Sequence, residues 1–346
     1  MEAVTFTEHG DTDVIEYGEV PDPQIGADEV LVDVRAGALN HLDVWTRRGS
    51  PGIDLAMPHV PGSDAAGVVE DVGAEVTRFT PGDRVAVAAG VSCGTCEFCR
   101  DGDPTLCVDF EIIGEHRPGV HSELAAVPAD NLVPVPEGVG WETAAAAPLV
   151  FQTAWRMLVT RADVSPGERV LVHGASGGVG HAAVQIADFA GAEVFATASS
   201  EAKLDYAREI GADHGVDYEE DDFAAEVRDA TGGRGVDVVV DHVGGDTWGD
   251  SLRSLAHGGR LVTCGATAGQ RPRTSIPRLF GNQLTVVGST MASPGEVDDA
   301  LARVWDGTFE VRIRDVLPMS ETARGHELLE NREGFGKVVV VPDGEQ

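Results

Sequence analysis

The stretch VLVHGASGGVGHAAVQIADF, residues 170–189, constrains the fold more than any other part of the sequence. It begins as an apolar strand and continues as an amphipathic helix, and the turn between them holds Gly174, Gly177, Gly178, Val179 and Gly180. Glycine lets a backbone turn sharply and approach a pyrophosphate, which binds at the N-terminus of the following helix. Because strand, turn and helix are all present, the stretch predicts a dinucleotide-binding loop. A glycine turn that serves only close helix packing is the alternative.

The rest of the chain surrounds this loop with two kinds of pattern. From 145 to 291, short apolar runs such as VDVVVDHVG alternate with helix-length segments, which predicts a Rossmann domain with a doubly wound parallel sheet. Residues 1–144 contain short alternating strands separated by Pro, Gly and Asp, a barrel-like β pattern. Residues 292–346 hold one amphipathic helix and the terminal strand GKVVVVP, which we expect to return to the N-terminal domain. The predicted fold class is therefore α/β, with domains 1–144 plus 292–346 and 145–291.

The end of the second Rossmann strand indicates which dinucleotide binds. NAD-binding chains place an acidic residue there, about 20 residues after the glycines, to bind the ribose 2′-hydroxyl. Here the strand ends in FATASSEAK, so Ser199, Ser200 and Lys203 take that place. Hydroxyls and an ammonium suit a 2′-phosphate, and Lys203 is one of two lysines in the chain, with Lys337. We predict NADPH; NADH and a plain surface role for Lys203 stay open.

Four of the five cysteines lie within a single short segment, about residues 92–108. Their spacing is Cys-x2-Cys-x2-Cys-x7-Cys, formed by Cys93, Cys96, Cys99 and Cys107. Four thiolates at this spacing suit one tetrahedral zinc ion in a closed structural site. An iron–sulfur cluster is the rival, but the last gap is longer than in ferredoxin-type runs and no Pro follows Cys107. We therefore predict one structural zinc, and a simple buried role for Cys264.

Taken together, these motifs resemble the medium-chain dehydrogenase/reductase superfamily along essentially the whole chain. The markers are the four-cysteine lobe and the stretches PHVPGSDAAGVVEDVGAEVTRFTPGDRVAV, HGASGGVG, DHVGG and GFGKVVV. The resemblance implies a GroES-like β-barrel catalytic domain built from both ends of the chain, joined to a Rossmann domain. It also implies an active site in the cleft between the two, and it matches the four cysteines to the family's structural zinc lobe.

The sequence departs from this family where its alcohol dehydrogenases bind a second, catalytic zinc. Asn40 stands where a Cys is expected, Gly62-Ser63-Asp64 replaces a Gly-His-Glu run, and Leu149 replaces a Cys or an acid. Asn, Ser and Leu are poor or impossible zinc ligands. We therefore expect no catalytic metal. Without a Lewis acid, hydride transfer is easiest to an acceptor that is already electrophilic, such as a quinone, enone, enal or enoyl thioester.

The stretch LNHLD resembles the quinone-oxidoreductase branch of the family, which lacks the catalytic zinc. That resemblance places Tyr218 and Arg332 with Lys203 around the 2′-phosphate, and Lys337 close to the cofactor. It places four further residues near the nicotinamide: Asn40, Thr153, Gly265 and Gly288.

We hypothesise that Asn40 donates a hydrogen bond to the substrate carbonyl and that Ser63 is a second donor. The alternatives are that Asn40 only caps a helix or turn and that Ser63 is merely small and polar.

Three functions remain open on the sequence. The first is an NADPH-dependent reductase of quinones or carbonyl-conjugated alkenes. The second is a zinc-dependent alcohol or polyol dehydrogenase with replacement ligands. The third is an NADPH-binding protein with little turnover.

The charge balance restricts the partners. With 58 Asp and Glu against 25 Lys and Arg, the net charge is -33, which disfavours nucleic acids and anionic membranes. No apolar run approaches about 18 residues and no signal segment is recognised, so we expect a cytoplasmic protein. The apolar run LTVVGSTM, residues 284–291, suits strand pairing between copies, and we expect a homodimer or homotetramer.

The dispersed acidic residues and scarce lysine predict a protein adapted to concentrated salt. At about 1 M, salt screens charge repulsion beyond roughly 3 Å, so a strongly acidic surface is tolerated there. We expect dialysis into dilute buffer to reduce both the enzymatic activity and the folded fraction of the protein. An enzyme assay would measure the first, and circular dichroism the second. Unchanged fold and activity in dilute buffer would contradict the prediction.

Overall fold

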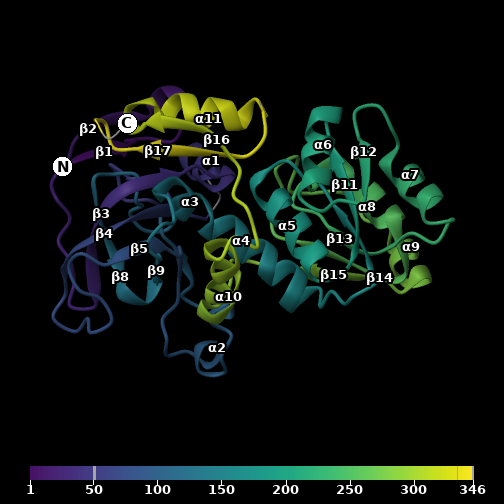
Figure 1. The fold of residues 1–346 in the computed structure, drawn as a ribbon, viewed down its shortest axis with the longest axis horizontal. Coiled ribbons are helices and arrows are strands. Elements are labelled where there is room, and N and C mark those ends of the chain that lie inside the picture. The colour runs from purple at the N-terminus through teal and green to yellow at the C-terminus, as the bar shows by residue number, and fades with distance from the viewer. Residues whose placement is uncertain (50–51, 333, 345–346) are drawn as a thin grey trace. The chain divides into compact units, whose positions relative to one another are not determined.

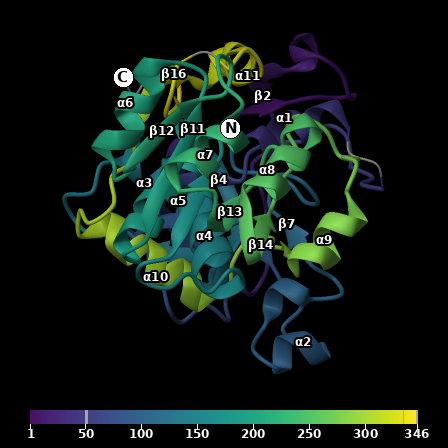
Figure 2. The same ribbon diagram turned by 90° about the vertical axis from the view of Figure 1, so that its right-hand side faces the viewer.

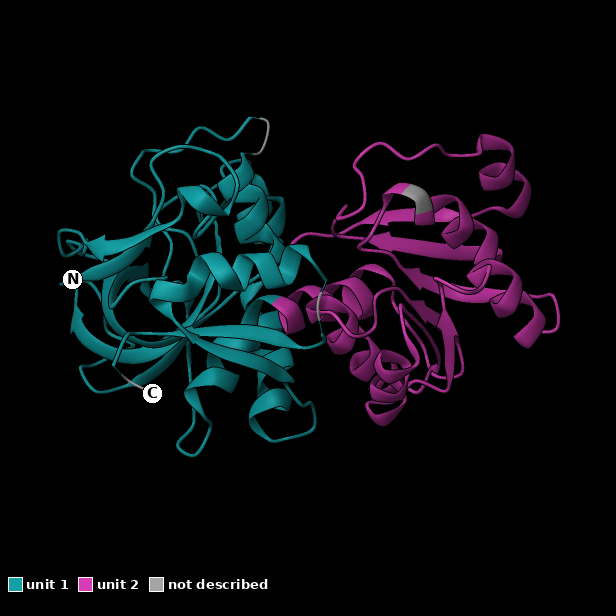
Figure 3. Ribbon diagram, turned by 90° about the horizontal axis from the view of Figure 1, so that it is seen from above, with its two compact units in different colours: residues 1–149, 293–346 teal, residues 150–292 magenta. Residues whose placement is uncertain are grey.

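The computed structural model describes residues 1–49, 52–332 and 334–344. The chain forms two compact units, which Figure 3 shows in different colours. Unit 1 comprises residues 1–149 and 293–346, and unit 2 comprises residues 150–292. The divisions expected from the sequence, at 144/145 and 291/292, lie close to these.

Unit 2 contains a six-stranded parallel sheet (Figure 1). Its strands, in spatial order, are β12 (His214–Asp217), β11 (Glu193–Ala198), β10 (Arg169–Val172), β13 (Val236–Val240), β14 (Leu255–Thr263) and β15 (Thr285–Gly288). In chain order this is 3-2-1-4-5-6, the order of the dinucleotide-binding Rossmann fold. The predicted doubly wound parallel sheet is confirmed.

Helices cover both faces of this sheet. They are α4 (Pro148–Trp155, which begins in unit 1), α5 (Gly178–Phe189), α6 (Glu201–Glu209), α7 (Phe223–Ala230), α8 (Trp248–Ser254) and α9 (Ile276–Asn282). Helices α7 and α8 lie side by side on one face, and α5 lies on the other (Figures 1 and 2). The strands are therefore apolar on both sides. Leu171, Phe195 and Leu261 pack in one buried cluster with α7 and α8, and the alternate residues of two of these strands are also fully buried: Val170, Val172 and Val194.

Unit 1 is built around a seven-stranded, mainly antiparallel sheet. Its strand order is β16 (Ile313–Pro318), β17 (Lys337–Val341), β3 (Glu29–Ala38), β4 (Asp64–Val72), β5 (Arg84–Val87) and β9 (Leu132–Pro134), with β8 (Leu124–Pro128) paired to β3. The C-terminal strand β17 pairs with β3, so the terminal strand returns to the N-terminal part of the chain as predicted. Two short ribbons complete the strands: β1 (Glu2–Thr5) with β2 (Glu16–Glu19), and β6 (Gly90–Val91) with β7 (Glu111–Ile112).

The helices of unit 1 are α1 (His41–Arg48), α2 (Glu97–Arg100), α3 (Trp141–Ala146), α10 (Pro294–Trp305) and α11 (Thr322–Glu330). Helix α3 packs onto the sheet through small side chains, since Ala144 and Ala145 contact a cluster containing Ala36, Ala66 and Val339. Small residues on both sides let helix and sheet approach closely. Among the described residues, no helix is long and apolar enough to cross a membrane.

Candidate active site and metal centre

Three strand ends meet at the candidate active site of unit 1. In the antiparallel pairing of β3 with β4, Ala38 lies opposite Asp64, the first residue of β4. On the other side of β3, Ala38 lies opposite Val339 of β17. Asn40 follows the end of β3 by two residues, and Lys337 begins β17. Strand register therefore brings Asn40, Asp64 and Lys337 together.

These three side chains form a buried hydrogen-bonded network. The Lys337 Nζ donates to Asn40 Oδ1 at 2.6 Å and to Asp64 Oδ2 at 3.3 Å. Asn40 Nδ2 donates to Asp64 Oδ2 at 2.9 Å and to the Ala38 carbonyl at 3.3 Å. Lys337 is 3% exposed and Asp64 is fully buried. A buried charge pair is stabilised only when its remaining polar atoms are also bonded, and the Asn40 amide supplies that bridge.

The Asp64 carboxylate also binds the backbone next to Leu149. Its Oδ1 accepts a hydrogen bond from the Leu149 N–H at 2.9 Å. Burial raises the pKa of Asp64, and the Lys337 ammonium opposes that rise. Both carboxylate oxygens thus face N–H donors, and the Leu149 side chain has no ligand atom. The residues present do not fit a catalytic zinc ion at the positions where the family resemblance expects its ligands.

The two predicted substrate donors are engaged inside the protein. Ser63 is fully buried, and its hydroxyl donates to the Ile113 carbonyl at 2.7 Å. Asn40 uses both amide hydrogens, but its bond to Ala38 is long. Donation to a substrate stays a prediction for both residues: Ser63 would have to give up a short bond and Asn40 only a weak one.

Asp43 anchors the start of α1 beside this network. Its Oδ2 accepts a hydrogen bond from the Asn40 N–H at 2.7 Å, and its Oδ1 has no hydrogen-bond partner among the described residues. Complete burial raises the pKa of Asp43 to about 7; the Asn40 N–H and Lys337 work against the rise, whereas Asp64 adds to it. Asp43 therefore has a structural role: it supports the turn that presents Asn40.

The glycine-rich loop of unit 2 has the geometry that a pyrophosphate site needs. Helix α5 begins at Gly178, with Gly177 as its N-cap and Val179 in its first turn, so N–H groups at its start lack helical partners. Gly174 has a φ of +56°, which favours glycine. A Cβ at Gly180 would lie 2.1 Å from the Gly174 carbonyl oxygen, so only glycine allows this close approach of turn and helix.

The residues predicted to recognise a 2′-phosphate gather at the end of β11. Lys203 Nζ donates to Ser199 Oγ at 3.0 Å, and Ser200 is the N-cap of α6. The backbone N–H of Tyr218 donates to the Ala198 carbonyl at 3.1 Å, which holds the end of the neighbouring strand at the same point. The structure thus places an ammonium, two hydroxyls and a tyrosine at one edge of the parallel sheet.

The other predicted cofactor residues are more dispersed. Gly265 follows β14 and Gly288 ends β15, so both lie at the carboxyl edge of the sheet, where ligands of such sheets bind. Thr153 is buried in α4. Arg332 follows α11 in unit 1 with a left-handed φ of +53°. A meeting of Arg332 with Lys203, or of Thr153 with Asn40, stays a prediction.

Sequence reasoning missed the partnership of Lys337 with Asp64, which lie 273 positions apart in the chain. One local signal was available. Each is an ionisable residue directly before an apolar run, Lys337 before VVVV and Asp64 before AAGVV. A buried charge requires an opposite charge.

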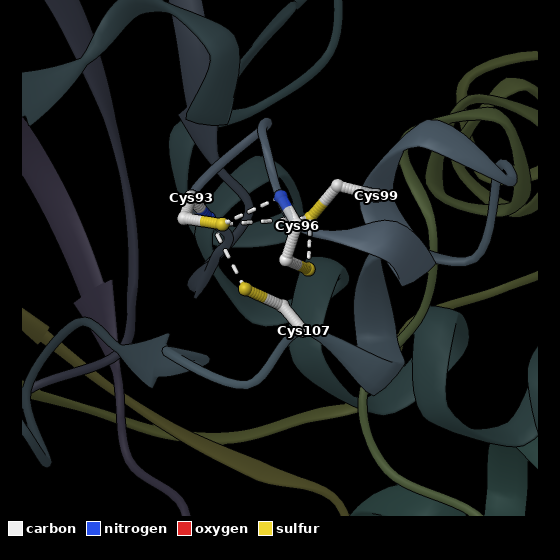
Figure 4. A group of neighbouring side chains, drawn as sticks. All are labelled: Cys93, Cys96, Cys99 and Cys107. Carbon is white, nitrogen blue, oxygen red and sulfur yellow. Dashed lines mark hydrogen bonds between the residues drawn. The ribbon is translucent and has the colours of Figure 1, made fainter.

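The four cysteines form a compact cluster (Figure 4). All four Sγ atoms lie within 4.8 Å of one another; the Cys93–Cys99 pair is 4.0 Å apart and the Cys96–Cys99 pair 3.5 Å. Tetrahedral zinc with Zn–S bonds of about 2.3 Å requires S–S distances of about 3.8 Å. Hydrogen bonds from the Thr95 backbone and hydroxyl, then from the Cys96 N–H, lower the pKa of Cys93 to about 6, whereas burial raises the pKa of Cys99 to about 11. A bound metal ion would deprotonate the coordinating thiols. The donor set fits one zinc ion with no open position.

Comparison with known proteins agrees with both units. A family model described as alcohol dehydrogenase GroES-like domain matches residues 26–137, and one described as zinc-binding dehydrogenase matches residues 178–306. A quinone oxidoreductase of Pseudomonas aeruginosa is 33% identical over 98% of this chain and 99% of its own. An acryloyl-coenzyme A reductase of Sulfurisphaera tokodaii is 31% identical over 94% of this chain and 95% of its own. A solved NAD-dependent alcohol dehydrogenase is 45% identical, with a TM-score of 0.94 over 99% of both chains.

The buried Asp43 predicts a pH-dependent difference between the protein and its D43N variant. The folded pKa of Asp43, about 7, exceeds its ordinary value of 3.8, so the folded state holds the proton more tightly. Its contribution to stability is therefore complete below about pH 4 and is lost as pH rises through 7. The side-chain amide in D43N would keep an acceptor for the Asn40 N–H but would not titrate. We expect D43N to gain stability relative to the wild type between pH 5 and pH 8, measured by urea unfolding; a constant difference would refute the assignment.

Proposed function

The chain belongs to the medium-chain dehydrogenase/reductase superfamily, in its quinone-oxidoreductase-like branch, and on that basis we propose that it is an NADPH-dependent reductase of quinones or carbonyl-conjugated alkenes. The conjugated acceptors are enones, enals and enoyl thioesters, and no catalytic metal takes part. The reduced dinucleotide supplies a hydride; with one proton from solvent, the acceptor gains two hydrogens. Relatives named as a quinone oxidoreductase and an acryloyl-coenzyme A reductase support this acceptor class.

The observation that carries the proposal is the Lys337 ammonium, bonded to Asn40 and Asp64 at the positions that would otherwise hold a metal. Hydride addition to a quinone or a conjugated carbonyl places negative charge on oxygen. A fixed cation in a buried site stabilises such charge without reorganising water. An ordinary alcohol requires more, because an alkoxide must form first, and a Lewis acid normally makes that accessible.

Asn40 supplies the directional contact in this proposal. Lys337 fixes the Oδ1 end of the amide and Asp64 fixes one N–H, so the amide cannot flip without breaking both bonds. The remaining N–H makes only a 3.3 Å bond to the Ala38 carbonyl. A substrate carbonyl can replace that weak acceptor at small cost, which makes this N–H the donor that orients the acceptor.

NADPH is the proposed coenzyme. Its 2′-phosphate carries negative charge, and the end of β11 offers the Lys203 ammonium and the hydroxyls of Ser199 and Ser200. The strand itself ends without an acidic residue to bind a ribose 2′-hydroxyl, and Glu201, three residues further on, is paired with Arg208 at 2.6 Å. One similar solved structure is that of an NAD-dependent alcohol dehydrogenase, so NADH is the coenzyme to compare with NADPH.

Zinc has a structural role in the proposal. The four-cysteine cluster would hold one ion that fixes the segment between β6 and β7, and with four thiolates it would offer no position for substrate. The second candidate function, a zinc-dependent alcohol dehydrogenase, is favoured by the alcohol dehydrogenase among the similar structures. Metal content separates the two.

The same proposal includes a homodimer or homotetramer in the cytoplasm. Strand β15 is an edge strand of the parallel sheet, and Val286 on it is 43% exposed. Nearby on the chain, Ile276 and Phe280 of α9 are 61% and 71% exposed. An exposed apolar edge favours pairing with a second copy. A cluster of four thiols without disulfides suits a reducing compartment.

A screen in concentrated salt tests the reaction. Loss of NADPH absorbance would be followed with quinones, enones, enoyl thioesters, aldehydes and ketones, alongside zinc analysis of the purified protein. We expect turnover of the conjugated acceptors and about one zinc per chain. About two zinc ions per chain, with chelator-sensitive oxidation of alcohols, would support the alternative dehydrogenase. Tight NADPH binding without reduction of any acceptor would support a binding protein.

The chain's two lysines provide a matched pair of variants. K337M removes the cation beside Asn40, so we expect kcat at saturating NADPH to fall roughly 100-fold. K203M alters only the 2′-phosphate position, so we expect a higher KM for NADPH and little change in kcat. Because K337M leaves Asp64 buried and unpaired, stability will fall too. The double variant D64N/K337M should recover the fold without recovering kcat; recovery of both would mean that Lys337 is only structural.

A further inference from the structure

Beneath the glycine-rich loop of unit 2 lies a polar cluster that the proposed reaction does not use. Its members are His173 after β10, Thr197 near the end of β11, Asp241 after β13 and Ser251 in α8. None of these side chains is more than 2% exposed, so a ligand bound at the protein surface would not contact them directly. Buried polar groups usually either stabilise the fold or hold functional groups in place.

The cluster is one continuous hydrogen-bonded chain with a defined direction. Ser251 Oγ lies 2.7 Å from Asp241 Oδ2 and 2.9 Å from His173 Nε2. Ser251 has a single hydroxyl proton, and a carboxylate accepts it more strongly than the Thr247 carbonyl at 3.0 Å. His173 Nε2 must then carry a hydrogen and donate to Ser251.

The tautomer of His173 follows. With the hydrogen on Nε2, Nδ1 is an acceptor. Thr197 Oγ1 lies 3.0 Å from that atom and donates to it. Burial lowers the pKa of His173 to about 4, so the ring is neutral at physiological pH, as this arrangement requires. Hydrogen bonds run in one direction from Thr197 to the Asp241 carboxylate.

Each end of this chain is tied to a loop at the carboxyl edge of the sheet. The Thr197 carbonyl accepts from the Ala175 N–H of the glycine-rich loop at 3.0 Å. At the other end, Asp241 Oδ1 accepts from the N–H groups of Val243 and Gly244, at 3.0 and 2.8 Å, and so folds the loop after β13. The chain therefore joins the loops that follow β10, β11 and β13.

We propose that His173 is a positioning residue that selects NADPH, because through Thr197 it holds the end of β11 against the glycine-rich loop. Ser199 and Lys203 follow Thr197 closely in the chain, so their distance from the pyrophosphate site depends on where Thr197 is held. The pyrophosphate and the 2′-phosphate belong to one NADPH molecule. The protein groups that bind them must therefore be the same distance apart as the two phosphate positions. This inference rests on the proposed use of NADPH.

The test substitutes the buried hydroxyl that never meets the coenzyme. T197V keeps the shape of the side chain and removes the donor to His173. We expect NADPH affinity, measured by coenzyme fluorescence in concentrated salt, to fall about three- to tenfold, as for the loss of one buried hydrogen bond. NADH affinity should change less than about twofold, since NADH has no 2′-phosphate to misplace. A merely structural hydroxyl would change the two affinities equally.

Two further variants make the result decisive. S251A breaks the same chain at its next link, so it should lower the NADPH-to-NADH affinity ratio, and T197V/S251A should lower it no further than the larger single effect. T231V is the matched control: Thr231 is a buried threonine of the same unit, bonded to Val227 at the end of α7, and its loss should leave the ratio unchanged. Additive effects of T197V and S251A, or an equal effect of T231V, would overturn the proposal.

The wild-type ratio separates this inference from the function on which it rests. If the wild type binds NADH as tightly as NADPH, the proposed coenzyme is wrong and the inference falls with it. If the wild type prefers NADPH and T197V leaves that preference intact in a folded protein, the inference alone is wrong.

Discussion

The buried ion pair between Lys337 and Asp64 is the interaction on which the candidate active site depends. Moving two charges out of water costs several kcal/mol per ion, so such a pair persists only when its other polar atoms are bonded. Asn40 bridges the two charges, and the Leu149 N–H occupies the second carboxylate oxygen. In meeting this requirement, the network fixes the ends of β3, β4 and β17 and the start of α1. The same bonds that keep the charges buried therefore hold the Asn40 amide in one orientation.

The parallel sheet of unit 2 also contains buried polar groups at its strand ends, but it satisfies them without a cation. Its strands end in a buried region that must also present polar loops to a dinucleotide. A neutral histidine between a threonine and a serine carries hydrogen bonds from β11 to the Asp241 carboxylate, and no cation is needed because that carboxylate accepts three donors. The glycines then bring the backbone close without side chains in the way, as the 2.1 Å approach at Gly180 shows. The hydrogen-bonded strand ends hold the loops in place, and the glycines leave the backbone N–H groups accessible to a charged ligand.

The two candidate sites account for the positions of the chain's two lysines. The chain carries 58 acidic residues and only two lysines, and each lysine lies where a flexible point charge has a specific partner. Lys337 is buried against Asp64, and Lys203 contacts Ser199 at the predicted phosphate position. Arginine forms many of the surface ion pairs, such as those of Arg253 with Asp222 and Arg234 with Asp237. Lysine in this protein is thus concentrated at candidate functional positions.

Residue type and spacing were enough to predict the parts whose geometry is set within one turn or one strand–helix unit. The glycine spacing at 174–180 defined the dinucleotide loop, the Cys-x2-Cys-x2-Cys-x7-Cys spacing defined the thiolate cluster, and alternating apolar runs defined the parallel sheet. Chain connectivity leaves such short segments few alternatives, so residue type and spacing suffice. Asn40 was found through its resemblance to a known pattern, but its partners were not. Three other features became visible only in the folded chain: Lys337 meets Asp64 across 273 positions, both amide hydrogens of Asn40 are engaged, and His173 joins three strand ends. These contacts depend on strand pairing between distant segments: a shift of one residue between β3 and β4 or β17 would turn Asp64 or Lys337 to the opposite face of the sheet. The residues around either strand do not identify its partner, so the pairing could not be predicted from them.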